Sequence, residues 1–225
     1  MYKIKIISSL FFLNTSSYSK RSFFRSRLEG LEYQILFSFV KESKKILKYK
    51  TSKEEQRKLI LSFGKAAILI DDMQDENMEF SSKEFIKSLE IIKNSLLNNS
   101  HREKFYYNLN VIMKNQRGNT MKEFKRKGGA FALCLIYLLN PLTFDAKIAK
   151  AFYYGGAWGQ IIDNYADGEC DEDTLKKFSS EYRTEIKKLI GNEKVIIPFA
   201  EDLISLSKFS RLPLLKNIFN FLNKS

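Results

Sequence analysis

Two groups of acidic residues have a spacing that could place several carboxylates together on one face of a helix. The first is the run DDMQDE, from Asp71 to Glu76, which ends an apolar helical pattern. The second follows the aromatic, glycine-rich run FYYGGAWG and contains Asp163, Asp167 and Asp171. Buried carboxylates repel one another and are costly to desolvate, so a cation is expected between them. Oxygen ligands of this kind suit Mg²⁺.

The positions of the acids relative to their apolar neighbours predict that both groups face the protein interior. In each run, residues that follow one another along a single helix face change from apolar or small to acidic. These residues are Leu59, Phe63, Ala67, Asp71 and Asp75 in the first run, and Phe152, Gly156, Gln160, Asp163, Asp167 and Asp171 in the second. Two such helices would aim their carboxylates at a shared hollow. A solvated acidic helix end explains either run equally well when the run is taken alone.

The two runs resemble the aspartate-rich motifs of the class I isoprenoid synthase superfamily. This superfamily includes trans-prenyl diphosphate synthases, squalene and phytoene synthases, and terpene cyclases. DDMQD at Asp71 to Asp75 is similar to the first motif, DDxxD. QIIDNYAD at Gln160 to Asp167 is similar to the second, QxxDDxxD, with Asn164 in place of the middle aspartate. Lys127 in KGGAFALCL is similar to the lysine of the KTxxLF segment that precedes the second motif.

The resemblance implies an enzyme in which bound Mg²⁺ grips an allylic diphosphate whose loss leaves a carbocation in an apolar cavity. The function it implies is an Mg²⁺-dependent prenyl transferase acting on an isoprenoid diphosphate. Its catalytic aspartates would be Asp71, Asp72, Asp75, Asp163 and Asp167, and its metal ligands Asp71, Asp75, Asp163, Asp167 and Asp171. Expected diphosphate-binding residues are Lys127, Arg126 and Arg117, and expected residues of the substrate pocket are Phe63, Tyr154, Trp158 and Gln160.

Departures from the family pattern leave other functions open. NMEFSSK follows the first motif where prenyl synthases carry a pair of arginines, and only 92 residues separate Asp71 from Asp163. A terpene cyclase, a head-to-head synthase of the squalene or phytoene type, and a non-catalytic accessory subunit of the same fold are therefore alternatives. The formal net charge of +12 also permits nucleic acid binding, which we place last because no nucleic-acid motif occurs.

Apolar periodicity predicts an all-α, single-domain antiparallel bundle of about eight helices, trimmed relative to the isoprenoid synthases. Only three prolines occur and the first is Pro141, so long helices are permitted. Thr51 or Ser52 would cap the helix that ends in DDMQDE. The other helices are predicted over residues 31–48, 83–97, 101–114, 120–139, 144–166, 173–190 and 195–208, with a short one after Pro213.

Composition predicts the bounds of the domain, its cellular location and its partners. Residues 29–225 form the helical domain, and residues 1–28 are basic, lack acids and could direct the chain to an organelle. Two cysteines are too few for a disulfide framework, so a reducing, cytoplasmic location is the default expectation. Besides the isoprenoid diphosphate, the expected partners are a second copy of the chain or another synthase, and an anionic membrane surface.

Overall fold

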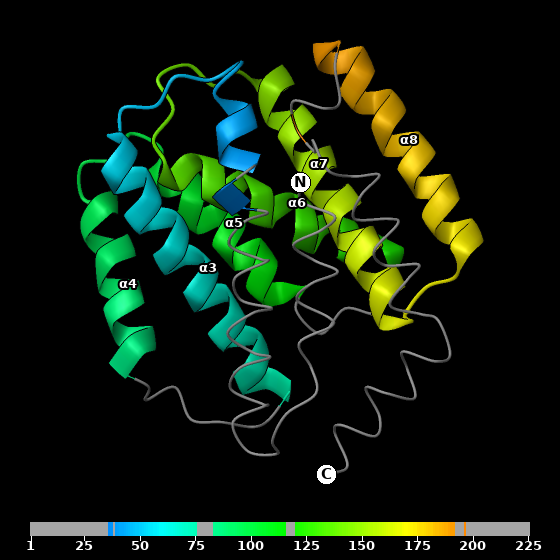
Figure 1. The fold of residues 1–225 in the computed structure, drawn as a ribbon, viewed down its shortest axis with the longest axis horizontal. Coiled ribbons are helices and arrows are strands. Elements are labelled where there is room, and N and C mark those ends of the chain that lie inside the picture. The colour runs from blue at the N-terminus through cyan, green and yellow to red at the C-terminus, as the bar shows by residue number, and fades with distance from the viewer. Residues whose placement is uncertain (1–35, 38, 76–82, 116–119, 192–195, 197–225) are drawn as a thin grey trace, which may run out of the picture.

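The described part of the chain is all-α. The computed structural model describes residues 36–37, 39–75, 83–115, 120–191 and 196 (Figure 1). Within these ranges the only β-type pairing is an isolated bridge between Tyr49 and Pro141. The predicted all-α class is confirmed for this part of the chain. The basic segment 1–28 and the helices predicted over 195–208 and after Pro213 lie outside the described residues, apart from Ile196.

From Lys53 onward the described helices begin and end close to their predicted bounds, whereas the helix predicted over residues 31–48 ends at Ser43. The described helices comprise a short helical stretch over residues 36–43, with residue 38 not described, then α3 (Lys53–Asp75), α4 (Lys83–Leu96), α5 (Arg102–Lys114), α6 (Met121–Leu138), α7 (Ala146–Asp167) and α8 (Glu172–Ile190). None of the helices in these ranges is long and apolar enough to cross a membrane.

Side chains at the helix ends account for these boundaries. At the start of α6 the Thr120 side chain accepts from the Glu123 N–H, and the Glu123 carboxylate accepts from the Thr120 N–H, which forms a capping box. Ser52 and Glu55 make the same reciprocal pair at the start of α3. Gly168, with φ of 85°, ends α7 in the left-handed conformation that glycine adopts without strain.

α6 lies between α3 and α7 and runs antiparallel to both. The Thr51 hydroxyl, just before α3, donates to the Leu139 carbonyl at the end of α6, and further along the ring of Phe63 contacts that of Phe131. Residue numbers therefore rise along α3 as they fall along α6. The short connection from α6 to α7 and the packing of Gly156 on Gly128 give the same antiparallel sense. Thus α3 and α7 run in the same direction, as Figure 1 shows.

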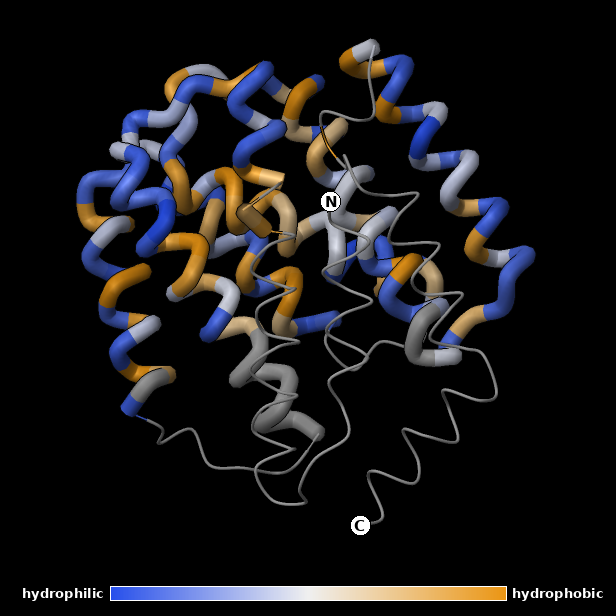
Figure 2. Tube along the Cα trace, viewed as in Figure 1, coloured by the Kyte–Doolittle hydropathy of each residue, from blue (hydrophilic) through white to orange (hydrophobic). Residues whose placement is uncertain are grey.

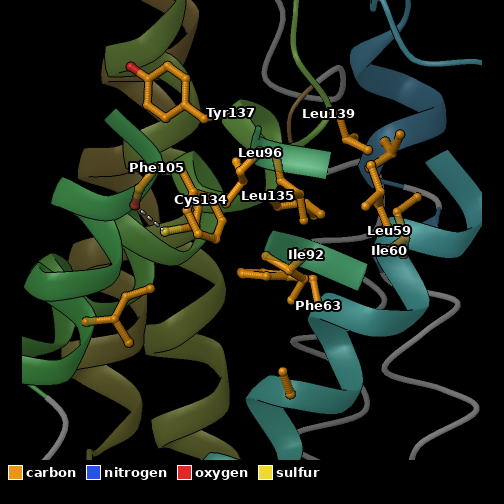
Figure 3. Packing of buried hydrophobic residues seen from close by; sticks show 14 of the residues in the cluster. Leu59, Ile60, Phe63, Ile92, Leu96, Phe105, Cys134, Leu135, Tyr137 and Leu139 are labelled. Atoms are coloured by element: carbon orange, nitrogen blue, oxygen red, sulfur yellow. Dashed lines mark hydrogen bonds between the residues drawn. The ribbon is translucent and has the colours of Figure 1, made fainter. Parts of the chain in front are cut away.

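The first hydrophobic cluster joins α3, α4, α5 and α6. Leu59, Ile60 and Phe63 of α3 are buried, and Figure 3 shows them facing residues of α4 and α6. Behind them, the Cys134 thiol of α6 lies 3.5 Å from the Phe105 carbonyl of α5. Burial raises the pKa of this thiol far above its usual range. Cys134 is therefore a core residue with little thiolate at neutral pH.

A second hydrophobic cluster fixes α8 against α7. Trp158 is 3% exposed, and its indole Nε1–H donates to the Ser179 hydroxyl on α8 at 2.9 Å. Leu175, Tyr182 and Ile186 on α8 are buried against the same face. The outer part of α8 is polar, and its apolar residues recur at helical spacing (Figure 2).

Candidate functional site

The two acidic runs lie at the same end of the helix bundle. Because α3 and α7 run in the same direction, their carboxyl ends, Asp75 and Asp167, both lie toward the amino end of α6. In Figure 1 both helices run downward, so that these ends are their lower ends in the view. Both acidic segments therefore end on the side of the bundle at which α6 begins.

Side-chain positions are described for part of the predicted acidic set. Asp71, Asp72 and Asp75 occupy the last turns of α3 and Asp167 ends α7, and their side chains lie outside the described part. Asp163, one turn before the end of α7, is exposed. Its carboxylate is thus accessible from solvent, and the prediction that this acid faces the interior is wrong.

The close approach of α6 and α7 positions the second motif. A Cβ on Gly128 would meet the Gly156 carbonyl and would lie 2.6 Å from the Cβ of Gln160. A Cβ on Gly156 would in turn meet the Gly128 carbonyl and lie 2.6 Å from the Cβ of Ala132. Only glycine lets the two backbones pack this closely. This contact brings Gln160 against α6. It also determines how close the following turn of α7 lies to α6.

Gln160 organises the next turn of α7 by hydrogen bonds. Its Nε2–H donates to the Asn164 Oδ1 at 2.8 Å and to the Asp163 Oδ2 at 3.3 Å. Asn164 is 2% exposed, and its Nδ2 makes no hydrogen bond within the described structure. The residue that replaces the middle aspartate of the family motif is therefore a buried amide held by Gln160.

Asp171 does not continue the acidic stripe of α7, and this part of the prediction is wrong. α7 ends at Asp167, and the left-handed turn at Gly168 redirects the chain. Asp171 is instead the N-cap of α8, where its carboxylate accepts from the Thr174 N–H at 2.7 Å. Asp163 and Asp171 are eight residues apart but do not belong to one helix, so they do not share a helix face. Asp171 has a structural role that needs no metal.

The three basic residues expected to bind diphosphate fall in different places. Lys127 is half-buried and shares the α3-facing side of α6 with Phe131, four residues later. Arg126 is exposed, and its charge acts on the Tyr153 phenol, which covers Gly129 elsewhere on α6. Arg117 lies outside the described residues. Of the three, Lys127 lies on the side of α6 nearest the acidic run of α3.

The aromatic residues expected to line one pocket are separated in the structure. Phe63 is buried, with its ring 4.9 Å from that of Phe131 and 6.3 Å from that of Phe105, in the first cluster. Trp158 is buried against α8 in the second cluster, and the ring of Tyr154 lies 5.8 Å from that of Tyr182 on α8. Tyr154 and Trp158, one turn apart on α7, therefore both pack toward α8, whereas Phe63 lies in the other cluster. Gln160 alone of the four lies within the turn that carries Asp163.

The tyrosines beside α8 surround Lys125. The Lys125 Nζ lies 4.8 Å from the ring centre of Tyr154 and 5.2 Å from that of Tyr182, and 3.7 Å from the Glu181 carboxylate. Burial, followed by the nearby charge of Glu181, raises the pKa of the Tyr182 phenol. These contacts fasten α8 to α6 and α7 through cation–π and ionic interactions.

Two features near the acidic helix ends were not selected from the sequence. Phe124 is half-buried and precedes Phe131 by seven residues, so the two start from similar sides of α6, but Phe124 packs against the second hydrophobic cluster and Phe131 against the first. Gly159 is one turn before Asp163, and a Cβ built there would have no atom within 4 Å. The i, i+3, i+7 spacing of Phe124, Lys127 and Phe131 was the signal in the sequence that could have revealed this face.

No group of three or more His, Cys, Asp or Glu that could hold a metal occurs among the described side chains, a set that excludes Asp71, Asp72, Asp75 and Asp167. Comparison of the chain with protein-family models, curated proteins and solved structures finds no match.

Proposed function

We propose that the chain is an Mg²⁺-dependent enzyme of the isoprenoid-synthase type that ionises an allylic prenyl diphosphate and transfers the prenyl group. The observation that supports the proposal is the shared direction of α3 and α7, which puts the ends of both helices on the side of the bundle at which α6 begins. The bundle would be a trimmed form of the isoprenoid-synthase fold.

The donor set fits a hard divalent cation. Asp71 and Asp75 on α3 and Asp163 and Asp167 on α7 supply carboxylate oxygens, which Mg²⁺ prefers, from two helix ends that flank α6. The exposed position of Asp163 leaves it accessible to a metal that retains several waters. Bound Mg²⁺ would stabilise the negative charge that develops on a departing diphosphate. Asp171 is left out of this set because it caps α8.

The chain's own residues then have distinct tasks. Gln160 would hold the Asp163 carboxylate through the 3.3 Å hydrogen bond, and Lys127 would place its ammonium against the diphosphate. The allylic carbon–oxygen bond breaks, and its electron pair leaves with the diphosphate. The carbocation then gains the π electrons of the acceptor, which loses a proton. Phe124 and Phe131 on α6 would keep water from the cation.

Incubation with prenyl diphosphates tests the proposal. Purified protein is mixed with Mg²⁺ and geranyl, farnesyl or geranylgeranyl diphosphate, with and without isopentenyl diphosphate, and diphosphate release and organic products are measured. We expect an elongated diphosphate only when isopentenyl diphosphate is present, and loss of turnover in Asp71→Asn and with a chelator. A hydrocarbon formed without isopentenyl diphosphate would instead identify a cyclase or a head-to-head synthase. Release of no diphosphate from any substrate would contradict catalysis.

A non-catalytic accessory subunit of the same fold is the second candidate, and Asn164 favours it. At the position where the family motif has a carboxylate, this chain has a buried amide whose Oδ1 is occupied by Gln160. A neutral amide weakens the second metal site without disturbing the helix. Mg²⁺-dependent binding of a prenyl diphosphate without turnover, together with co-purification of a larger synthase, would support this function over the first.

A further inference from the structure

The end of the bundle opposite the acidic helix ends is built from three loops that are joined by hydrogen bonds. These loops lie before α3, between α4 and α5, and between α6 and α7. The bonds are Lys50 N–H to Asn140 O (3.0 Å), Leu142 N–H to Lys48 O (2.7 Å), Thr51 Oγ1 to Leu139 O (2.9 Å), Asn99 Nδ2 to Tyr137 O (2.9 Å) and Ser100 Oγ to Asn140 Oδ1 (2.9 Å). We call this surface the three-loop end and define it as residues 44–53, 97–104 and 139–147.

A strained residue lies at the centre of this junction. Asn140 has a φ of 53°, in the left-handed region that asparagine tolerates better than most residues, and it is 8% exposed. Its carbonyl and its side chain each bind a different loop. The three loops therefore form one surface of fixed shape.

The three-loop end carries an excess of exposed positive charge. Eight of its residues are Lys or Arg, all of them exposed, and only Glu103 and Asp145 are acidic. The basic residues are Lys44, Lys45, Lys48, Lys50, Lys53, Arg102, Lys104 and Lys147. Lys45 pairs with Glu42, and the Asp145 carboxylate caps α7. This excess equals half of the net charge of +12 that the whole chain carries.

Two leucines project from the same surface. Leu97, after the end of α4, is 61% exposed, and Leu142, after Pro141, is 54% exposed. They are the most exposed aliphatic side chains in the described part of the chain, and each lies in a loop with lysine or arginine neighbours. Exposed apolar side chains surrounded by basic ones match a lipid surface, which offers anionic headgroups above an apolar layer.

We propose that the three-loop end docks on an anionic membrane surface, with Leu97 and Leu142 entering the headgroup region and the surrounding lysines contacting lipid phosphates and carboxylates. α7 is about 33 Å long, so this orientation would hold the acidic helix ends well away from the lipid surface. The inference stands apart from the proposed enzyme function, because it uses none of the residues assigned to that site.

Vesicle flotation tests this docking. The probe is phosphatidylcholine vesicles with about 30 mol% phosphatidylserine, compared with pure phosphatidylcholine vesicles. We expect the full-length protein to float with the anionic vesicles only. The double variant Leu97→Ser/Leu142→Ser should bind them about tenfold more weakly. Lys48→Glu/Lys50→Glu should also lower binding about tenfold, and added salt should weaken the binding of the unmodified protein.

Matched variants on α4 control for general apolar and basic character. Ile86→Ser/Leu89→Ser changes two similarly exposed side chains, 48% and 42% exposed, and Lys83→Glu/Lys87→Glu changes two exposed lysines near the far end of the bundle. Both should bind vesicles as the unmodified protein does. Equal binding to neutral vesicles, or unchanged binding of the leucine variant, would overturn the proposal. So would tight binding of single-stranded RNA by a protein that ignores the vesicles.

Discussion

At the scale of single residues, Asn164 distinguishes this chain from the family motif that it resembles. The amide is 2% exposed and accepts a hydrogen bond from Gln160, and its Nδ2 has no partner in the described structure. A neutral side chain at this position avoids the cost of burying a carboxylate without a cation. The amide at position 164 thus lets α7 stay folded without a bound cation.

Substituting the family's aspartate should destabilise the free protein in a pH-dependent way. In Asn164→Asp, burial should raise the pKa of the introduced carboxyl above its unfolded value of about 4. The variant should match the unmodified protein below that pH and lose about 1 to 3 kcal/mol of unfolding free energy as the pH rises past the folded pKa. Urea unfolding at acidic and neutral pH measures the difference, with the exposed-site variant Asn110→Asp as control.

Added Mg²⁺ should have the opposite effect on the stability of Asn164→Asp. If the carboxyl lies next to the proposed metal, millimolar Mg²⁺ should restore part of the lost stability at neutral pH, because metal binding to the folded state shifts the unfolding equilibrium. A variant that is fully stable at neutral pH without metal would show that the position is not an apolar one.

Asp171 provides a second test at this scale. Its carboxylate accepts from the Thr174 N–H, so Asp171→Ala should lower the unfolding free energy by about 1 kcal/mol, whereas Asp171→Asn retains a capping side chain and should change it little. Thermal unfolding followed by circular dichroism checks this order. Loss of Mg²⁺-dependent ligand binding in Asp171→Asn, with its stability intact, would return Asp171 to the metal-ligand set.

At the scale of helices, the contact of Gly128 with Gly156 determines where the second motif lies. A methyl group on either glycine would overlap the carbonyl of the other. Gly156→Ala should therefore push α6 and α7 apart, lower the unfolding free energy by about 1 to 3 kcal/mol, and weaken ligand binding by displacing Gln160. Gly159→Ala on the same helix should instead raise the unfolding free energy by about 0.5 to 1 kcal/mol, because its Cβ meets nothing.

Denaturant unfolding of the two alanine variants measures this contrast. Both substitutions raise helix propensity equally, so any difference between them reports the packing of α7 on α6. If Gly156→Ala proved as stable as Gly159→Ala, the two helices would have room to adjust and would not position Gln160.

The sequence predicted the helices well because their ends carry local signals. Ser52 before α3 and Thr120 before α6 are capping residues with a glutamate three positions later. It predicted the arrangement of the aromatic side chains poorly. Helical periodicity shows that Phe63 and Trp158 are buried but not against which helix, and that depends on long-range packing. The error at Asp171 came from extending one helical register past Gly168, where φ is 85°.

At the scale of the whole molecule, charge is distributed unevenly along the bundle. Acidic runs end α3 and α7, while the three-loop end holds eight exposed basic residues. The antiparallel connections, which return every second helix end to the same side, produce this separation. The proposed cation and diphosphate site and the proposed membrane-docking surface would therefore lie at opposite ends of the bundle.

Calorimetric titration with a non-ionising prenyl thiolodiphosphate, with and without Mg²⁺, tests most directly whether the two acidic runs form one site. We predict Mg²⁺-dependent binding that weakens about tenfold or more in Asp71→Asn and in Asp163→Asn, an effect of about 1.4 kcal/mol each. The loss of binding free energy in the double variant should be smaller, by at least about 0.5 kcal/mol, than the summed losses of the two single variants. The reason is that both residues would hold the same metal and diphosphate. Asp173→Asn, an exposed acid in the first turn of α8, should bind normally. Absence of Mg²⁺-dependent binding, or strictly additive losses in the double variant, would contradict a shared site.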